Sequence, residues 1–235
     1  MPLLNWWHAA VPLALSNNSD CECHDVDVEF AAELARVLPD DIPHRARLIE
    51  KAAAHLTLIL AANEHFNLTR IINAPEAAIK HVFDSVAPWR YFAGVRRVLD
   101  AGTGAGFPGV PLSLVLPDVR FTLAESTQKK ARFVDSAVES LELHNVEVLG
   151  DRAEQIALAQ RPEIITARAV APLDRLLEIF AKPMKQGAKL ILYKGPEVET
   201  ELAAVKKYRI KAEQLSRYEL PDGLGTRVLL SIEAR

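Results

Sequence analysis

Cysteine is nearly absent from this sequence. Only Cys21 and Cys23 occur among the 235 residues, with a single residue between them. Two cysteines exclude a disulfide framework and a four-cysteine zinc site by count. His24 would complete no more than part of a metal site, and the polar, acid-rich surroundings are more typical of a tail. We therefore predict no metal centre.

Long apolar runs and an excess of positive charge are also missing. No apolar run reaches the roughly 18 residues that a membrane span needs, so we expect no membrane contact. The apolar start of the chain has no basic residue ahead of it, which is atypical of a signal peptide, and we expect a cytoplasmic protein. The net charge of −3 argues against nucleic-acid binding driven by overall charge, while a local basic face remains compatible with it.

Glycine is scarce but strongly clustered. The chain has 10 glycines, and Gly102, Gly104, Gly106 and Gly109 directly follow a strand-like apolar run that ends near Asp100. Glycine lacks the Cβ atom that would hold a ligand away from the main chain, and it accepts positive φ angles. We interpret this segment as a strand-to-helix turn that binds a ligand against its backbone.

Two ligand classes use such a turn. The last three of these glycines satisfy the G-x-G-x-x-G pattern of dinucleotide-binding proteins, and Glu125 follows about twenty residues later. Asp100 with the first three glycines instead resembles the first motif of class I S-adenosylmethionine-dependent methyltransferases. A carboxylate at the strand end would attract the cationic amino group of a methionine moiety and repel a pyrophosphate. Charge therefore favours the methyl donor, while Glu125 suits the ribose of either cofactor.

The apolar patterning divides the chain into three parts. Residues 1–25 form an irregular tail, residues 26–90 a helical cap, and residues 91–235 the cofactor-binding domain. In the cap, helical spacing of apolar residues covers 26–37, 48–62 and 75–86. The two later parts are long enough to bury a sizeable core.

Short apolar runs alternate with helical segments after residue 91. Strands are expected at 97–101, 121–125, 146–149, 164–167 and 189–193, and helices at 129–141 and 173–182. This alternation indicates a parallel sheet with helices on both faces. Two strand-like runs, 208–220 and 226–232, predict a terminal hairpin at the sheet edge. The expected fold is α/β: a class I S-adenosylmethionine-dependent methyltransferase sheet, Rossmann-like and mostly parallel, with a C-terminal antiparallel hairpin and an N-terminal helical cap.

Residues that follow the strands are expected to form one site, because ligands of open parallel sheets bind beyond the carboxyl ends of the strands. Glu125 is predicted to hold the ribose hydroxyls, Ala153 and Glu154 to flank the adenine, and Phe107 to cover the cofactor. Arg168 is the candidate catalytic residue, acting by positioning the target base.

Structural roles remain open for several of these residues. Asp151 fits a helix N-cap with Glu154 at the capping-box position. Phe107 fits an ordinary core position, and Arg168 fits an ion pair with Glu154 or Asp100.

The expected methyl acceptor follows partly from missing residues. Methylation of a pyrimidine carbon in RNA commonly uses a cysteine nucleophile, and both cysteines lie in the tail. Enzymes that methylate exocyclic amines usually have an Asn/Asp-Pro-Pro-aromatic turn after the fourth strand, whereas residues 166–172 read TARAVAP. A ring nitrogen such as guanine N7 carries a free lone pair, so its methylation needs alignment more than a strong base.

A series of motifs between about Leu56 and Gly195 resembles the ribosomal small-subunit methyltransferase G family, also called glucose-inhibited division protein B. The motifs are Asn67-Leu68-Thr69, His81 to Ser85, Asp100 to Gly109, Lys129 to Phe133, Arg152-Ala153-Glu154, Arg168-Ala169 and Lys194-Gly195. The resemblance implies methylation of guanine N7 in the decoding-centre loop of 16S rRNA. It assigns cofactor contacts to Gly102, Phe107, Ala153, Glu154 and Arg168, with Glu125 as the ribose acid where Asp is frequent.

The partner implied by this resemblance is 16S rRNA, within a small-subunit particle. An acidic protein needs locally concentrated positive charge to bind RNA. The candidate basic segments are Arg96-Arg97, Lys129-Lys130-Arg132, the region 182–194, and Lys206-Lys207-Arg209-Lys211. Because the overall charge is unfavourable, we expect naked rRNA to be a poorer substrate than an assembled or partly assembled particle.

Two other functions remain open from the sequence. An NAD-dependent oxidoreductase would use the last three glycines of the turn and a hydride-relay acid such as His81. A noncatalytic sensor of the methyl donor, linked to cell division, would bind the cofactor without modifying rRNA. His81, Asp84 and Ser85 share one predicted helix face, where they either close the pocket or form a structural hydrogen-bond cluster.

Overall fold

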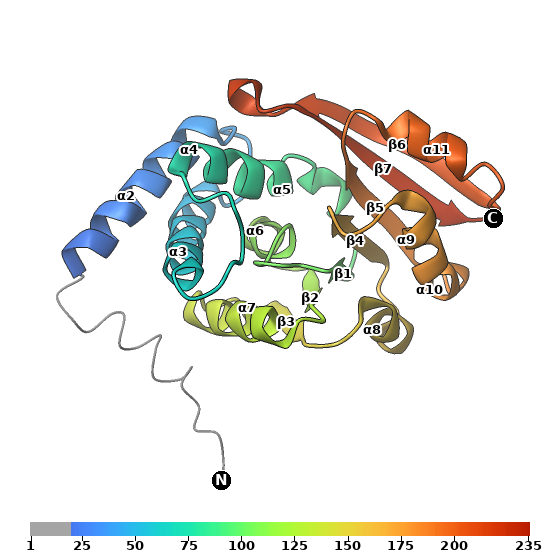
Figure 1. The fold of residues 1–235 in the computed structure, drawn as a ribbon, viewed down its shortest axis with the longest axis horizontal. Coiled ribbons are helices and arrows are strands. Elements are labelled where there is room, and N and C mark those ends of the chain that lie inside the picture. Colours follow the sequence, from blue (N-terminus) through green and yellow to red (C-terminus); the bar gives the residue numbers. More distant parts are fainter. Residues whose placement is uncertain (1–19) are drawn as a thin grey trace, which may run out of the picture.

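Seven strands form one sheet in the computed structural model, which describes residues 20–235 (Figure 1). In chain order they are β1 (Arg97–Ala101), β2 (Arg120–Ala124), β3 (Val146–Leu149), β4 (Ile164–Arg168), β5 (Lys189–Lys194), β6 (Ile210–Glu219) and β7 (Thr226–Ala234). The spatial order is β3-β2-β1-β4-β5-β7-β6. β1 to β5 are parallel, whereas β7 pairs antiparallel with both β5 and β6. The predicted parallel sheet and terminal hairpin are confirmed.

The chain direction across the sheet reverses at β1, which has β2 on one side and β4 on the other. Helices that follow neighbouring strands at such a point lie on opposite faces, which leaves a crevice beyond the carboxyl ends of the strands. The glycine turn directly follows β1 and therefore lies at this crevice.

Both faces of the sheet are buried at its centre, which explains why β1, β4 and β5 are nearly continuous apolar runs. Successive residues of β1 enter different cores: Val98 packs with the cap, α6 and α7, and Leu99 packs with the helices of the other face. Ile164 and Ile165 of β4 repeat this division. The alternation follows from the period of two residues along a strand.

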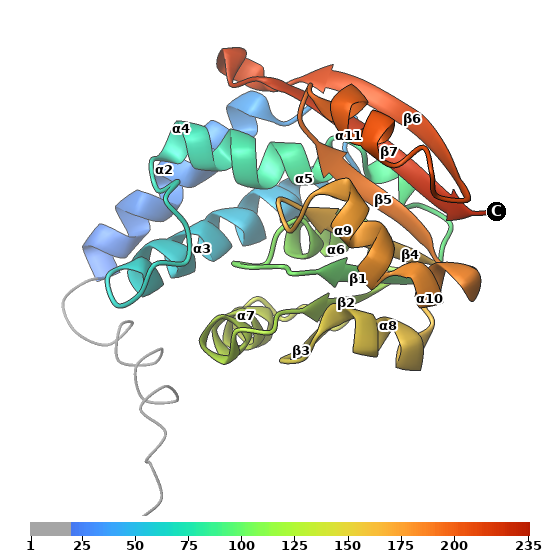
Figure 2. The same cartoon turned by 45° about the vertical axis from the view of Figure 1, so that its right-hand side comes forward.

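Two groups of helices cover the two faces (Figure 2). On one face lie α6 (Gly109–Val115) and α7 (Gln128–Ser140), and the cap packs against them through α3 (Arg45–Asn63) and α5 (Asp84–Val86). The cap also contains α2 (Asp20–Val37), α4 (Ala74–Ala77) and the π-helical segment Ala78–Phe83. The other face carries α8 (Ala153–Gln160), α9 (Leu173–Ile179), α10 (Ala181–Lys185) and α11 (Val198–Ala204). Short 3₁₀ turns occur at Trp89–Tyr91 and Pro221–Gly223. No described helix is long and apolar enough to cross a membrane.

The cap shares its core with the sheet domain. Phe30 and Leu34 of α2, Leu56 of α3 and Phe121 of β2 belong to one continuous cluster of buried side chains. The apolar residues whose spacing predicted the cap helices therefore form the face that packs onto the domain. The expected boundary near residue 90 separates elements but does not separate hydrophobic cores.

The structure differs from the expected element boundaries at two places. Helix α2 begins at Asp20 rather than at Val26, because the acidic residues of this segment lie at a helix N-terminus, where negative charge is favoured. Residues 1–19 and the side chains before Asp25, including the cysteines, lie outside the described part. The helix expected over 173–182 is split at Phe180, since Pro183 has no N–H to continue the hydrogen-bond ladder.

Candidate active site

A cavity of about 1010 Å³ lies where β1, β4 and β5 end. Its walls come from the glycine turn, from the loop that follows β4, and from cap residues between Leu68 and Asp84. This volume is at the upper end of the range for small-molecule sites, about 300–1,000 Å³. The cavity therefore has room for a cofactor and part of an acceptor, and the cap is one of its walls.

The backbone of the glycine turn faces this cavity at Gly102 and Gly104. Gly104 has φ +64°, and a Cβ atom built on it would meet no atom within 4 Å. The turn is fixed to β2, because the N–H groups of Gly102 and Thr103 donate to the carbonyl of Ala124 at 2.9 and 3.1 Å. An open glycine backbone on a fixed support is the arrangement that allows a ligand to approach the main chain.

The other two glycines of the turn do not line the cavity. A Cβ on Gly106 would lie 2.9 Å from the His55 ring, and one on Gly109 would overlap Leu123 of β2 and the Asp100 carboxylate. Gly106 therefore contacts the cap and does not line the cavity, and its expected role as a cofactor contact stays a prediction. Gly109 lets α6 pack closely on the sheet.

Asp100 lies beneath the turn. Its side chain has no exposed area, and one carboxylate oxygen accepts from the Thr103 hydroxyl at 2.6 Å and from the Gly109 N–H at 2.8 Å. Burial raises its pKa to about 6. The carboxylate shapes the turn from below and does not line the cavity. Its expected contact with a methionine amino group stays a prediction.

Glu125 follows β2 and lines the cavity. Its carboxylate accepts from the N–H of Gly104 at 3.1 Å and from the N–H of Thr127 at 2.8 Å. The side chain is only 8% exposed. Each carboxylate oxygen keeps further acceptor capacity, so Glu125 is oriented to accept from a diol placed beside the glycine turn.

Phe107 lies between two buried histidines of the cap. Its ring stacks on His81 with centroids 4.5 Å apart and contacts the His55 ring at 5.0 Å. Burial lowers the pKa of His55 to about 4 and that of His81 to about 3, and the positive charge of Arg168 also lowers the pKa of His81. Both imidazoles are therefore neutral at pH 7. Phe107 lines the cavity and belongs to the core at the same time.

Ala153 and Glu154 are the first two residues of α8, next to the end of β3, and neither lines the cavity. The expected cap at Asp151 is wrong, because Arg152 is the N-cap residue and its side chain makes no capping hydrogen bond. Glu154 instead pairs with Arg152 at 3.8 Å. Ala153 and Glu154, which we expected to contact an adenine, therefore lie outside the cavity wall.

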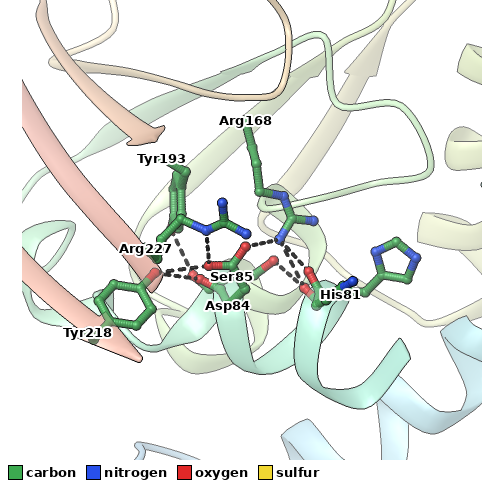
Figure 3. A network of polar contacts seen from close by, with 8 residues as sticks. His81, Asp84, Ser85, Arg168, Tyr193, Tyr218 and Arg227 are labelled. Atoms are coloured by element: carbon green, nitrogen blue, oxygen red, sulfur yellow. Dashed lines mark hydrogen bonds and ion pairs between the residues drawn. The ribbon is translucent and has the colours of Figure 1, made fainter. Parts of the chain in front are cut away.

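Arg168, at the end of β4, lines the cavity and is fixed to the cap (Figure 3). Its Nη1 atom donates to Asp84 Oδ2 at 3.1 Å and to the Lys80 carbonyl at 2.9 Å. The side chain is 12% exposed. Its acidic partner is thus Asp84. The two partners that the sequence suggested, Glu154 and Asp100, do not pair with it.

Asp84 is the centre of a buried polar cluster (Figure 3). Its second oxygen, Oδ1, accepts from Arg227 Nε at 2.9 Å and from the Tyr218 hydroxyl at 3.1 Å. We call Asp84, Arg168, Tyr218 and Arg227 the Asp84 cluster. Sequence reasoning missed Arg227 and Tyr218, because both belong to the hairpin, where no motif marks them. His81 and Asp84 line the cavity, whereas Ser85 donates to the His81 carbonyl within the helix.

The cavity is more positive than the protein as a whole. Five cationic and three acidic side chains line it, which gives a net charge of +2 against −3 for the chain. The cations are Lys80, Lys130, Arg168, Lys194 and Arg227. Of the basic segments expected from the sequence, only Lys130 and Lys194 reach this wall, because the charge is brought together by the fold and not by runs in the chain. No group of three or more His, Cys, Asp or Glu in the described residues is arranged to hold a metal ion.

Comparison with known families decides how this site is classified. The model of the rRNA small subunit methyltransferase G (GidB) family matches residues 48–227, a range that contains every residue lining the cavity. The chain belongs to this family. The ribosomal RNA small subunit methyltransferase G of Solibacter usitatus is 56% identical over 86% of this chain and 99% of its own length. That of Symbiobacterium thermophilum is 38% identical over 78% of this chain and 81% of its own.

Solved structures support the fold assignment. A cofactor-bound structure of Rv0187 from MTB aligns with a TM-score of 0.53 at 16% identity, covering 77% of this chain and 90% of that one. The methyltransferase domain of METTL16 aligns with a TM-score of 0.51 at 15% identity, covering 80% of this chain and 81% of that one. At such identities the likeness concerns the fold alone, and it agrees with the Rossmann-like α/β sheet of this chain.

Proposed function

We propose that this protein is an S-adenosylmethionine-dependent methyltransferase that modifies N7 of a guanine in 16S rRNA. One observation carries the proposal. The residues that match the small subunit methyltransferase G family line one large cavity, whose wall contains an open glycine backbone, Glu125 and five cationic side chains. The glycine backbone and Glu125 suit an adenosyl cofactor, and the excess of cations suits an anionic acceptor such as RNA.

The turn and its neighbours fit the cofactor. Gly104 leaves space where a side chain would stand, and the Glu125 carboxylate beside it has acceptor capacity for both ribose hydroxyls. Gly102 and Phe107 continue this wall. Asp100 contributes negative charge from beneath the turn, which favours a cationic ligand. Ala153 and Glu154, at the start of α8, remain our proposed neighbours of the adenine once the cofactor is bound.

The chemistry requires positioning more than proton transfer. S-adenosylmethionine supplies an electrophilic methyl carbon; the N7 lone pair forms the new bond to it while the electrons of the carbon–sulfur bond return to sulfur. N7 carries no proton, so no side chain has to remove one. The neutral stacked rings of His81 and Phe107 exclude water from this wall. Arg168, fixed by Asp84, is our candidate for holding the acceptor in line.

The test is mass spectrometry of rRNA fragments after incubation with a labelled methyl donor. A small-subunit particle that lacks the modification should acquire label on one guanine, and alkaline cleavage should place it at N7. We expect naked 16S rRNA to react more slowly than the particle, because the chain has a net charge of −3 and the particle presents the target loop already folded.

The same preparation distinguishes the alternatives. Tight binding of NAD without binding of S-adenosylhomocysteine, measured by calorimetry, would support an oxidoreductase and contradict the proposal. Cofactor binding with no label in any rRNA fragment would support the noncatalytic sensor. Label on a different atom or RNA would refute the proposed acceptor and leave the methyltransferase assignment in place.

A further inference from the structure

The Asp84 cluster leaves unbalanced positive charge in the cavity wall. Two guanidinium groups, those of Arg168 and Arg227, share the single carboxylate of Asp84. The side chain of Asp84 is fully buried, and those of the two arginines are 12% and 23% exposed. A poorly solvated cation without its own counter-ion is costly unless another anion pairs with it. The cluster therefore carries one positive charge more than its carboxylate balances, and one bound anion would neutralise it.

Of the other cations of the wall, Lys80 and Lys194 each have a carboxylate of their own, whereas Lys130 forms no ion pair within the described residues. Lys80 pairs with Glu76 at 2.5 Å, and Lys194 pairs with Glu201 at 2.7 Å. Within the described residues, Nη1 and Nη2 of Arg227 and Nε and Nη2 of Arg168 make no hydrogen bond. Both arginines line the cavity, so these donors belong to side chains that an incoming ligand contacts.

Their position assigns them to the acceptor. Glu125 follows β2. Arg227 lies in β7 beside Val228, which pairs with Lys194 at the end of β5. Four strand spacings of about 4.8 Å separate β2 from β7, which is about 19 Å. On the proposed function, the adenosyl group lies at the Glu125 end and the methionine part over the turn after β1. Arg168 ends β4, only two strand spacings from β2, and shares Asp84 with Arg227. The pair therefore lies on the β4–β7 side of the cavity, away from Glu125, where the acceptor would enter.

We propose that Arg168 and Arg227 together bind one phosphodiester group of the RNA beside the target nucleoside, and that Asp84 is the positioning residue that aims both. Guanidinium groups suit phosphate because their forked N–H donors match its oxygens. Asp84 fixes each arginine through one edge and leaves the remaining donors for the ligand. This inference rests on an RNA acceptor, as proposed above, and deepens it by naming the subsite.

The experiment measures binding without turnover. The affinity of the protein, saturated with S-adenosylhomocysteine, for a 16S rRNA transcript is determined over a series of salt concentrations. Each lost phosphate contact reduces the slope of log affinity against log salt by about one. We expect this reduction for Arg227→Gln, with the original slope largely retained in Arg227→Lys. The matched control is Arg90→Gln, which removes an arginine that also pairs with one aspartate, Asp41, but lies outside the cavity; its slope should not change.

Two kinetic values complete the test. In methylation assays, Arg227→Gln should raise KM for RNA while KM for S-adenosylmethionine stays unchanged. Asp84→Asn should lower kcat without lowering the salt slope, because both cations remain but are no longer fixed. Since Asp84→Asn removes a buried charge that two arginines share, we expect it to destabilise the fold. The Arg227 variants therefore decide the test, after circular dichroism has shown that they are folded.

Three results would overturn the inference. A folded Arg227→Gln with an unchanged salt slope would show a structural role only. Weakened binding of S-adenosylhomocysteine with unchanged RNA binding would assign the arginines to the cofactor carboxylate. The same loss of slope in Arg90→Gln would make the effect one of net charge. Failure of the proposed function is distinguishable, because it would appear as absent methylation by the unmodified enzyme, whatever the salt slope of Arg227→Gln.

Discussion

At the scale of single residues, Glu125 connects the backbone of the turn to the proposed ribose site. Its carboxylate accepts two backbone N–H groups and still faces the cavity. Hydrogen bonds to a charged group contribute about 1.5–3 kcal/mol each. Glu125→Gln should therefore weaken S-adenosylhomocysteine binding roughly tenfold to hundredfold in calorimetry, whereas Glu125→Asp, which keeps the charge, should lose less. Equal affinities in all three proteins would refute the assigned contact.

His55 makes stability depend on pH. The folded protein holds its imidazole neutral with a pKa of about 4, against 6.5 for an exposed histidine, so the unfolded chain binds the proton first as pH falls. Stability should thus be lost between about pH 6.5 and pH 4, with an upper limit of about 3 kcal/mol for this residue. Urea unfolding at several pH values should show a smaller loss in His55→Gln than in the unmodified protein, and the remaining loss comes from His81, whose pKa burial also lowers.

Other buried groups determine how this measurement is controlled. Asp100 acts with the opposite sign: burial raises its pKa from 3.8 to about 6, so its contribution to stability falls as pH rises between these two values. The comparison with His55→Gln removes this contribution, because Asp100 is present in both proteins. His144→Gln changes an exposed imidazole and should leave the profile unaltered. A His55→Gln profile that parallels the unmodified one would contradict the assignment.

At the scale of elements, the turn between β1 and α6 needs its glycines for two different reasons. Gly104 leaves room for a ligand, whereas Gly109 leaves room for Leu123 and the Asp100 carboxylate. Gly109→Ala should therefore destabilise the fold by about 1–3 kcal/mol through overpacking. Gly195→Ala, at a position with no atom within 4 Å of the new methyl group, should change stability far less in the same urea unfolding experiment. Equal effects of the two substitutions would contradict this division of roles.

At the scale of the whole molecule, the cap and the sheet domain should unfold together. One hydrophobic core contains side chains of α2, α3, α6, α7 and the sheet, so the cap cannot leave without exposing the face it covers. We expect one calorimetric transition, and hydrogen exchange should protect the amides of α3 and β4 to a similar degree. Loss of protection in α3 under conditions that leave β4 protected would show a separately folding cap.

How much of the fold and of the site could be predicted from the sequence depended on whether the interactions involved are local or long-range along the chain. Strand and helix positions depend on the local period of apolar residues, so five parallel strands and the hairpin were correctly placed. Glu125 and Arg168 were correctly placed at the cavity, because residues after parallel strands meet at one edge. Asp100 and Gly106 do not line the cavity, since the motif indicated a ligand site but not which of its residues face the open space.

What the sequence alone determined is therefore the class of fold, the glycine turn and the family, all of which are encoded in short segments with their own periodicity and spacing. Only the tertiary structure decided which charges meet. Arg227 reaches Asp84 across 143 positions of the chain, and His55 reaches the turn from a different helix. Neither contact has a local signature, because a buried ion pair is fixed by the packing of α5 against the sheet and by the cost of leaving a charge without a partner.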